Sequence, residues 1–492
     1  MARRTKIVAT LGPATDDKES IGALVKAGVD VVRLNLSHGV HDDHRRRATL
    51  VRECAKESGR HVAVLVDLQG PKIRVDRFEN GKVFLTEGAP FILDAACDPD
   101  KGTVERVGLA YKQLPNDVDS GDVLLLDDGR VVLEVEKVVG TEIHCSVVVG
   151  GDLSNSKGIN RQGGGLTAEA ITEKDRFDIT LAAEIEADYL AVSFPRSAAD
   201  VLRARGLLHA AGNKGAGIVA KIERSEAMEN LEEIIVASDV VMIARGDLGV
   251  EIGDAELPAA QKHIIKMARS LKRVVITATQ MMESMIENPI PTRAEVFDVA
   301  NAVLDGTDAV MLSAETAAGK YPSKAVSAMG RICIEAEKQL LLLADSHSHD
   351  HSHNLGNLAG DQFGRIDEAI AMATMYTANH MGVRAIIALT ESGSTPLWMS
   401  RISSGIPIYA MTPHLSTCRK VVLYRGVSPV QFGADTTDHA LLNKLAIEEL
   451  QQRTGLEDGD LVIITKGDLV GAHGGTNAMK IVRIGDMVEP DA

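Results

Sequence analysis

Aromatic residues and positive charge are both scarce in this chain of 492 residues. Aromatic side chains make up 3% of it, and 53 lysines and arginines stand against 69 aspartates and glutamates, which gives a formal charge of −16 at pH 7. A general nucleic-acid binder or a membrane-surface protein needs a cationic face. The composition therefore argues against both classes, while local basic sites for small anions stay open.

Cysteine is rare, and no two cysteines form a Cys-x-x-Cys pair. The five are far apart in the sequence: Cys54, Cys97, Cys145, Cys333 and Cys418. This spacing predicts buried, reduced thiols rather than a disulfide framework or a zinc site. No segment approaches the ~18 apolar residues of a membrane span, and the apolar run Ile7–Gly12 is too short for a signal peptide. We therefore expect a cytoplasmic protein.

The chain is rich in short β-branched runs that alternate with amphipathic segments. The predicted strands are Lys6–Leu11, Val31–Ser37, His61–Leu68, Tyr189–Phe194, Gly217–Glu223, Val240–Ala244, Val274–Thr279 and Ala309–Ala314. The predicted helices are Ser20–Ala27, Asp42–Glu57, Lys174–Ala187, Ala198–Ala210, Glu226–Ala237, Pro258–Leu271, Thr292–Leu304 and Pro322–Leu340. Alternation of buried strands with helices implies parallel crossovers, and eight such units predict a closed (β/α)8 TIM barrel.

About a hundred residues separate the third predicted strand from the next helix, far more than a barrel loop needs. This stretch contains the predicted strands Val83–Leu85, Val123–Leu126, Val131–Val138 and Glu142–Val149, separated by Asp-Asp-Gly, Ser-Gly-Asp and Gly-Gly-Asp turns. We interpret it as a small inserted β-barrel domain. Because it leaves the carboxyl end of a strand, it should cover the barrel mouth as a lid.

The remainder of the chain predicts a separate open α/β domain. It contains a predicted helix Glu368–Met381, strand Ala385–Leu389, helix Pro396–Ser403 and strand Ile408–Met411. The preceding histidines, His347, His349, His351 and His353, could bind a transition metal, but a solvated linker is favoured because nothing nearby would orient the rings. We therefore divide the chain into a barrel (1–70 and 167–345), a lid (71–166) and a C-terminal domain (346–492, with a linker at 346–360).

Polar residues gather at the carboxyl ends of the predicted strands, where a TIM barrel carries its catalytic groups. They are Arg33, Asn35, Ser37, His38, Asp67, Lys72, Arg74, Lys221, Glu223, Arg245, Asp247, Thr279, Ser313 and Glu315. A purely structural protein has little reason to place polar groups at so many strand ends. We therefore expect an active site at the barrel mouth.

Two carboxylates in this set, Glu223 and Asp247, suit a hard divalent cation, because Mg²⁺ takes one or two protein carboxylates and completes its shell with water and substrate oxygens. Lys221 shares one strand face with Glu223 and brings a compact positive charge beside them. Arg33 and Arg74 add cationic donors. Such a site suits a phosphoryl group whose charge is spread over three oxygens during transfer.

Several segments resemble the pyruvate kinase family, in order and over nearly the whole chain. They are Lys6–Thr15, Val32–His38, Lys221–Glu223, Ala244–Gly249, Thr277–Met285, Pro291–Glu295 and Ser313–Thr316. The resemblance also covers the inserted lid and the C-terminal domain. It implies transfer of the phosphoryl group of phosphoenolpyruvate to ADP, giving pyruvate and ATP, with Mg²⁺ or Mn²⁺ as the divalent cation.

The resemblance also implies a role for each matching position. Glu223 and Asp247 would bind Mg²⁺, Lys221 would stabilise the phosphoryl group in flight, and Arg33 would contact the phosphate of phosphoenolpyruvate. The backbone around Gly246 and Asp247 and the hydroxyl of Thr279 would bind the substrate carboxylate, and Thr279 would also organise protonation of the enolate. Ser313 and Glu315 would support the proton route and the subunit contact. The residues that would meet the nucleotide are Asn35, Leu36, Ser37, His38, Arg74 and Lys157.

One position departs from the K⁺-dependent members of the family. Their K⁺ ligands match Asn35, Ser37, Asp67 and the carbonyl of Leu68, but this chain has Lys72 where those members have glutamate. A lysine ammonium near the phosphoryl oxygens could supply the charge that K⁺ otherwise brings. We therefore predict that K⁺ is not required. The alternative is a solvated Lys72 with K⁺ still bound to the other residues.

The resemblance places a phosphate effector site in the C-terminal domain, at Thr390, Ser392, Gly393, Ser394 and Thr395, with Gly471–Asn477 closing over it. Hydroxyls and backbone N–H groups at the start of a helix can cradle a sugar phosphate or AMP. Family members often have a basic residue at Ser394, so a helix cap without a ligand stays open. The family also suggests a homotetramer, with no nucleic-acid or membrane partner.

Two other functions stay open at this point. A metal-dependent lyase or aldolase that acts on a 2-oxo acid would use the same carboxylates, but it has no need of Lys157 and Arg74 for a nucleotide. A catalytically dead sugar-phosphate sensor is disfavoured, because no catalytic position is lost.

Overall fold

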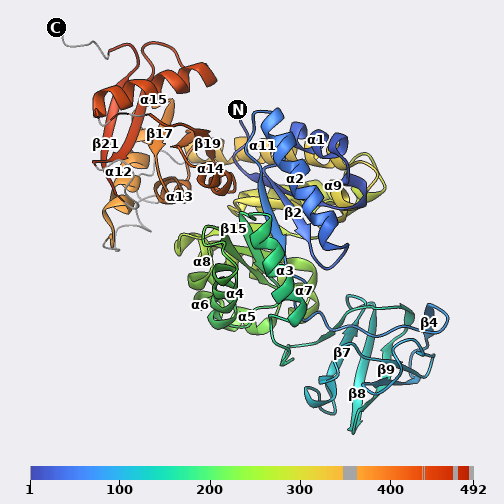
Figure 1. The fold of residues 1–492 in the computed structure, drawn as a ribbon. Helices are drawn as coiled ribbons and strands as arrows, with labels where there is room; N and C mark the ends of the chain where they lie inside the picture. Colours follow the sequence, from blue (N-terminus) through green and yellow to red (C-terminus); the bar gives the residue numbers. More distant parts are fainter. Residues whose placement is uncertain (1, 347–362, 435, 437, 469–474, 487–492) are drawn as a thin grey trace.

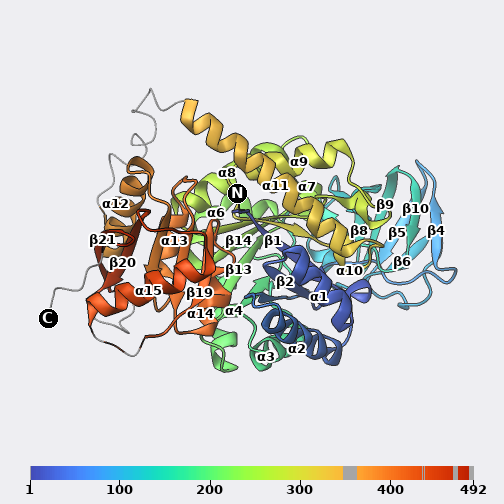
Figure 2. The ribbon, with the colours of Figure 1, turned by 90° about the horizontal axis from the view of Figure 1, so that it is seen from above.

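The computed structural model describes residues 2–346, 363–434, 436, 438–468 and 475–486. Its three parts lie in a row, with the C-terminal domain and the lid at opposite ends of the barrel (Figures 1 and 2). The barrel is closed by parallel strands in the order β1-β16-β15-β14-β13-β12-β3-β2. Their bounds are β1 Lys6–Leu11, β2 Val31–Asn35, β3 Ala63–Asp67, β12 Tyr189–Val192, β13 Gly217–Ile222, β14 Val240–Ala244, β15 Val274–Ala278 and β16 Ala309–Leu312. The predicted TIM barrel is confirmed.

The barrel strands are apolar on both faces because each face is buried in its own core. Alternate residues such as Val8, Leu65 and Met242 belong to one hydrophobic cluster, whereas their neighbours Ile7 and Val64 belong to a second cluster shared with the surrounding helices. A strand buried on both faces needs no polar alternation. This is why polar residues at the strand ends stand out in the sequence.

The helices of the barrel follow the predicted alternation with one break. They are α1 Lys18–Ala27, α2 His41–Glu57, α3 Glu173–Glu184, α4 Ala198–Ala210, α5 Ser225–Glu229, α6 Leu231–Ala237, α7 Arg245–Ile252, α8 Leu257–Ser270, α9 Arg293–Leu304, α10 Ala314–Ala317 and α11 Pro322–Ser346. The predicted single helix Glu226–Ala237 was wrong: it is divided at Asn230, whose Nδ2 donates to the carbonyl of Arg196 at 2.9 Å. Short α7 was not predicted.

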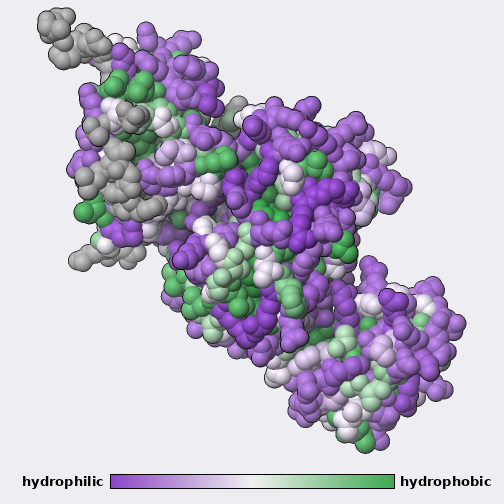
Figure 3. Space-filling model, in the orientation of Figure 1, coloured by the Kyte–Doolittle hydropathy of each residue, from purple (hydrophilic) through white to green (hydrophobic). Residues whose placement is uncertain are grey.

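The lid is a curled half-barrel, formed by a six-stranded sheet in the order β11-β7-β8-β9-β5-β6 and a two-stranded sheet β10-β4. Its strands are β4 Lys82–Leu85, β5 Pro90–Asp94, β6 Arg106–Gly108, β7 Val123–Leu126, β8 Val131–Val139, β9 Glu142–Val149, β10 Gly151–Ser154 and β11 Ile159–Arg161. The predicted Asp-Asp-Gly turn joins β7 to β8, with positive φ at Asp127, Asp128 and Gly129. On the face in Figure 3 the lid is mainly hydrophilic, with scattered hydrophobic residues.

The C-terminal domain is an open sheet in the order β19-β18-β17-β20-β21, with β21 antiparallel to β20. Its elements are α12 Ile366–His380, β17 Ala385–Leu389, α13 Ser394–Ser400, β18 Ile408–Thr412, α14 Leu415–Val421, β19 Val427–Gln431, α15 His439–Arg453, β20 Leu461–Gly467 and β21 Thr476–Arg483. The histidine run at 347–353 lies outside the described residues.

The C-terminal domain packs against the end of the barrel where the strands begin. Arg401 and Asp308 form an ion pair there, with side chains 3% and 0% exposed. The ammonium of Lys6 donates to the carbonyl of Val427 at 2.6 Å, and one hydrophobic cluster spans barrel and domain. The opposite end of the barrel, where the strands finish, is therefore left to the lid.

The described helices include none that is long and apolar enough to cross a membrane.

All five cysteines carry free thiols; Cys97 is half-buried, and the other four are buried. Burial raises the pKa of Cys145 to about 12. The prediction of unpaired thiols is confirmed, but the prediction that the thiols are buried was wrong for Cys97.

Candidate active site

Four charged side chains from three barrel strands form a connected network at the mouth. Nε of Arg33 lies 2.6 Å from Oδ2 of Asp67, and Nζ of Lys221 lies 3.4 Å from Oδ1 of Asp67 and 2.9 Å from Oε1 of Glu223. Arg33 lies two residues before the end of β2, and Asp67 is the last residue of β3. Lys221 is the last residue but one of β13, and Glu223 directly follows that strand. The predicted convergence of these residues on the mouth is present in the structure.

Two groups of this network, Asp67 and Lys221, are held in their charged forms by their neighbours. Burial acts to raise the pKa of Asp67, but Lys221 and Arg33 outweigh it and hold that pKa below its usual value. Burial likewise acts to lower the pKa of Lys221, yet Asp67 and Glu223 raise it above its usual value. The Lys221 ammonium therefore stays charged, as a group that stabilises transferred negative charge must.

Ser193, a residue that the sequence analysis missed, connects this network. Its hydroxyl accepts from Nζ of Lys221 at 2.7 Å and donates to the carbonyl of Leu68 at 2.8 Å. Ser193 follows β12, so a strand end that looked free of charged groups also contributes to the mouth. The polar residue after an apolar strand was the available signal.

The two candidate metal ligands lie close enough to influence each other. Burial raises the pKa of Glu223, Lys221 opposes the shift, and the negative charge of Asp247 adds to it. Oε2 of Glu223 accepts from the backbone N–H of Phe194 at 2.8 Å, which fixes the carboxylate. A buried carboxylate, Glu223, next to a half-buried one, Asp247, favours a cation between them, so this pair fits a divalent ion.

Among the described residues, no group of three or more histidine, cysteine, aspartate or glutamate side chains is arranged to hold a metal ion. This arrangement suits Mg²⁺, which needs one or two carboxylates, better than an ion held entirely by protein ligands. Asp247 stands in the first turn of α7, and Nζ of Lys72 reaches it from the lid connection at 3.0 Å.

Thr279 is held in an unusual backbone conformation. Its φ is +65° and that of Gln280 is +53°, in the left-handed region that side chains other than glycine rarely adopt. The Thr279 hydroxyl oxygen accepts from the N–H of Gly246 at 2.8 Å, and Arg245 donates to the Thr279 carbonyl. Such strain costs ~1–3 kcal/mol and is common at functional sites.

Glu315 accepts hydrogen bonds from two backbone N–H groups rather than from the charged network. Oε2 of Glu315 accepts from the N–H of Ser313 at 2.7 Å, and Oε1 accepts from the N–H of Met282 at 3.2 Å. Burial raises the pKa of Glu315 despite these bonds. In this structure Glu315 therefore connects the segments that follow β15 and β16.

The candidate nucleotide segment, Asn35–His38, lies beside the same cations. Burial lowers the pKa of His38, and the charges of Arg74, Arg33 and Lys72 lower it further. Lys174 of α3, which the sequence analysis did not single out, donates to the carbonyl of Leu36 at 2.7 Å. A lysine at the start of a helix gives no sequence signal that it reaches another strand.

The lid residue Lys157 is not turned to the mouth in this structure. Its Nζ pairs with Oδ1 of Asp127, also in the lid, at 2.8 Å. Arg74 donates to the carbonyl of Ser156 at 2.9 Å. The two candidate nucleotide contacts of the lid are therefore engaged within it.

The candidate effector loop has the expected position at the start of α13. The hydroxyls of Ser392 and Ser394 lie 2.8 Å apart, and Thr390 accepts from the N–H of Gly393 at 2.9 Å. The hydroxyl of Thr395 lies 2.7 Å from that of Thr476 on β21. Of the segment predicted to close over the loop, residues 471–474 lie outside the described residues.

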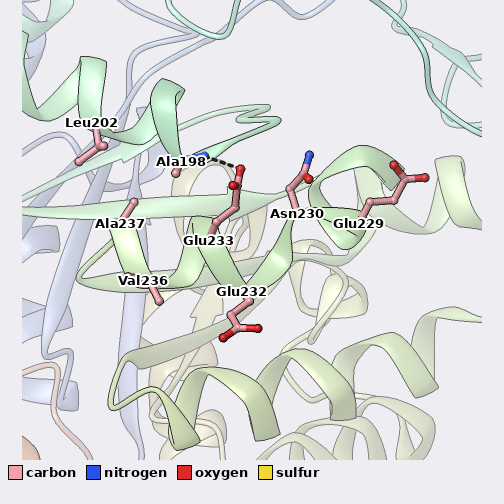
Figure 4. Close-up of a pocket in the computed structure, with 8 residues that line it drawn as sticks. All are labelled: Ala198, Leu202, Glu229, Asn230, Glu232, Glu233, Val236 and Ala237. Atoms are coloured by element: carbon pink, nitrogen blue, oxygen red, sulfur yellow. Dashed lines mark hydrogen bonds between the residues drawn. The ribbon is translucent and has the colours of Figure 1, made fainter.

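A separate hollow lies on the outer surface between α4 and α6, away from the mouth. It is lined by Ala198, Leu202, Glu229, Asn230, Glu232, Glu233, Val236 and Ala237 (Figure 4). Glu233 is already engaged, accepting from the N–H of Ala198 at 3.1 Å. Its acidic and apolar lining does not suit a phosphate.

A TIM barrel with a lid and a mouth of paired carboxylates and cations defines an enzyme that handles phosphoryl groups. A family model described as "Pyruvate kinase, barrel domain" matches residues 2–326, and one described as "Pyruvate kinase, alpha/beta domain" matches residues 368–482. The chain therefore belongs to the pyruvate kinase family, and these enzymes are phosphotransferases.

Curated relatives agree over nearly the whole chain. It is 56% identical over 486 residues to "Pyruvate kinase II" of Salmonella typhimurium, covering 98% of this chain and 99% of that protein. It is 55% identical over 469 residues to a pyruvate kinase of Haemophilus influenzae, covering 94% and 96%. A pyruvate kinase of Geobacillus stearothermophilus is 42% identical over 491 residues, covering 99% of this chain and 81% of the relative.

Proposed function

We propose that the mouth described above transfers the phosphoryl group of phosphoenolpyruvate to ADP, giving pyruvate and ATP. The observation that carries this proposal is the Lys221 ammonium, buried between two carboxylates and still charged. A positive charge fixed in a buried site stabilises phosphoryl oxygens more than the same charge in water. Arg33, held rigidly by Asp67, would bind the substrate phosphate.

The substrate carboxylate would lie at the start of α7, on the backbone N–H groups around Gly246 and Asp247 and on the Thr279 hydroxyl. The left-handed backbone at Thr279 supports this role, because it fixes the hydroxyl beside Gly246 before any substrate arrives. Thr279 would also organise protonation of the enolate, with Ser313 and Glu315 supporting the proton route.

Glu223 and Asp247 would hold a divalent cation, Mg²⁺ or Mn²⁺. When bound, that cation supplies charge neutralisation to the phosphoryl oxygens. The protein's own contribution is to fix the two carboxylates, through the N–H of Phe194 at Glu223 and through the first turn of α7 at Asp247. Asn35, Leu36, Ser37, His38, Arg74 and Lys157 would meet the nucleotide.

We further propose that K⁺ is not required. Three of the four candidate K⁺ ligands already have protein donors: Asn35 Oδ1 accepts from the N–H of Ser37 at 3.1 Å, Asp67 accepts from Arg33, and the Leu68 carbonyl accepts from Ser193. A lysine, Lys72, supplies monovalent positive charge at Asp247 instead. These contacts support a built-in replacement for the ion.

Regulation and assembly follow the same resemblance. The hydroxyl cluster from Thr390 to Thr395 would bind the phosphate of a sugar phosphate or AMP. A homotetramer would let that domain act across subunit contacts, and sedimentation as a fully active monomer would contradict it.

The free thiols support a cytoplasmic location. We keep the domain boundaries 70/71, 166/167 and 345/346 as a proposal.

The test of the reaction is coupled ATP formation from phosphoenolpyruvate, ADP and Mg²⁺. The wild-type chain should form ATP, and Lys221→Met should reduce kcat by at least about 10³-fold while the chain stays folded. A matched control is Lys262→Met, which removes an exposed lysine from α8 outside the mouth. Cleavage of a 2-oxo acid without ATP formation would favour the lyase or aldolase instead.

A further inference from the structure

One buried side chain joins the lid to both segments that carry the candidate metal ligands. Glu251, in α7, is 4% exposed. Its Oε1 accepts from Nδ2 of Asn160 in lid strand β11 at 3.4 Å, and its Oε2 accepts from the N–H of Ser225 at 3.0 Å. Ser225 follows Glu223 by two residues, and Asp247 lies one helical turn before Glu251. Lid, β13 and α7 therefore meet at one carboxylate.

The segment by which the lid returns to the barrel, residues 160–166, is held at several further points. Three of the bonds that hold it run from the N–H of Gly163 to the carbonyl of Glu251 at 3.3 Å, from the N–H of Gly165 to Oε1 of Glu226 at 2.5 Å, and from a guanidinium N–H of Arg224 to the carbonyl of Leu166 at 3.0 Å. Their partners lie in α7 or shortly after β13, and a longer fourth bond, at 3.4 Å, joins Arg196 to the carbonyl of Leu166. The return segment is thus anchored to the part of the barrel that bears the carboxylates.

The two chain connections between barrel and lid are bonded to each other. The N–H of Ile159 donates to the carbonyl of Ile73 at 2.9 Å, and the N–H of Val75 donates to the carbonyl of Lys157 at 2.9 Å. Movement of one connection therefore displaces the other, which carries Lys72 and Arg74. A residue that holds the return segment in place also controls where these cations lie.

We propose that Glu251 is a positioning residue that holds the lid hinge against the segments carrying Glu223 and Asp247. Removing it uncouples lid closure from the cation site, so that the lid contributes less to turnover. This inference rests on the proposed function, because it assigns Glu251 a part in the same reaction. Glu251 itself touches no substrate.

The groups that face the Glu251 carboxyl come from two directions. Asn160 faces it from the lid, and Arg224, Ser225 and Glu226 face it from the segment after β13. Burial raises the pKa of Glu251 from 4.5 to about 7; Glu226 adds to the shift, whereas Ser225, Arg224 and Asn160 oppose it. Hinge release returns the carboxyl to water and lowers its pKa. The Glu251 carboxyl has the higher pKa in the held hinge, and lowering the pH favours the state in which the pKa is higher. Low pH therefore favours the held hinge, and high pH favours its release.

The experiment measures hydrogen exchange of a peptide covering residues 158–166, in the free protein and corrected for intrinsic rates. In the wild-type protein, exchange should increase as pH rises from 6 to about 8.5. Glu251→Gln should abolish this pH dependence, because glutamine does not titrate. Glu251→Ala, and Asn160→Ala from the lid side, should increase exchange by about tenfold at every pH while the melting temperature of the barrel stays nearly unchanged.

Steady-state kinetics distinguish a positioning role of Glu251 from a general destabilisation of the protein. In Glu251→Ala and Asn160→Ala, kcat should fall by about tenfold while KM for phosphoenolpyruvate changes less than about twofold, since the proposed contacts of that substrate lie on the barrel. Glu229→Gln, a glutamate at the outer hollow of Figure 4, is the matched control and should behave like the wild-type protein.

Three results would overturn the inference. They are wild-type exchange in both alanine variants, a wild-type pH dependence in Glu251→Gln, and an equal change in Glu229→Gln. Absence of ATP formation by the wild-type chain would refute the proposed function. Because hydrogen exchange is measured without substrate, its result would still test whether Glu251 holds the hinge.

Discussion

The ammonium of Lys72 lies 3.0 Å from Oδ1 of Asp247, so a residue of the lid connection forms an ion pair with a candidate metal ligand of the barrel. The two side chains are 28% and 19% exposed. A partly buried pair in this position places a monovalent positive charge beside the proposed phosphoryl site. The pair also means that the proposed independence from K⁺ depends on a residue of the lid connection.

The first prediction follows from that pair. Wild-type activity with Mg²⁺ should be the same whether the other cation is K⁺ or tetramethylammonium, because Lys72 supplies the charge. Lys72→Glu should lower kcat by at least about tenfold in tetramethylammonium and regain activity on addition of K⁺. Initial rates in the two buffers measure both effects.

Lys82→Glu is the matched control, since it reverses an exposed lid lysine that pairs with Asp152. It should show no K⁺ dependence. A wild-type enzyme whose activity collapses without K⁺ and returns with it would refute the role of Lys72.

The second prediction concerns the lid lysine. Lys157→Met should reduce kcat by at least about tenfold and leave phosphoenolpyruvate binding nearly unchanged, because its ammonium acts when the lid closes over the transferred group. Steady-state kinetics together with equilibrium binding measure the two quantities. Lys82→Met, in the same lid, should match the wild-type enzyme. Equal turnover in Lys157→Met and wild type would remove the role.

The third prediction concerns the effector loop, and the sole tryptophan of the chain offers a probe. Trp398 lies in α13, the helix that begins at Ser394. A bound sugar phosphate or AMP should change Trp398 fluorescence and shift the phosphoenolpyruvate saturation curve to lower concentration. Ser394→Ala should weaken both responses by several-fold and leave activity without effector unchanged. Neither response with any of these ligands would remove the effector proposal.

The fourth prediction concerns the junction between barrel and C-terminal domain. Arg401→Met leaves Asp308 charged and buried, so the free energy of unfolding should fall by about 3–5 kcal/mol. Arg401→Met with Asp308→Asn should recover much of that loss, because no unpaired charge remains. Chemical denaturation followed by circular dichroism measures both variants. Equal stability of the two variants would show that the pair is not coupled.

The hydrophobic pattern was sufficient to predict the barrel, because its strands are buried on both faces and therefore stand out as continuous apolar runs. β1 and β14 have the predicted bounds, and the other barrel strands end one or two residues earlier than predicted or begin later. The polar residues at those ends belong to the mouth rather than to the ladder. The broken helix at Asn230 was missed because its cause, a bond to Arg196, is a tertiary contact.

The site shows the same division between local and tertiary information. The mouth cations and carboxylates are adjacent to strands, so the sequence places them there. Ser193 and Lys174 were missed because only the folded chain reveals their partners on other strands. Four lid strands were missed, β5, β6, β10 and β11. Of these, β6 and β11 have only three residues, which give no alternation to detect.

Barrel closure by β1 and β16 has a consequence for synthesis of the chain. β1 pairs with β2 through Val8 and Val31, but its other edge pairs with β16 through Lys6 and Ala309. That edge has no partner until the ribosome has released the segment near residue 312. The lid pairs within its own sequence and can fold first, as a compact unit held between two unfinished halves. A nascent chain stalled before β16 would therefore expose an apolar strand edge, which favours aggregation.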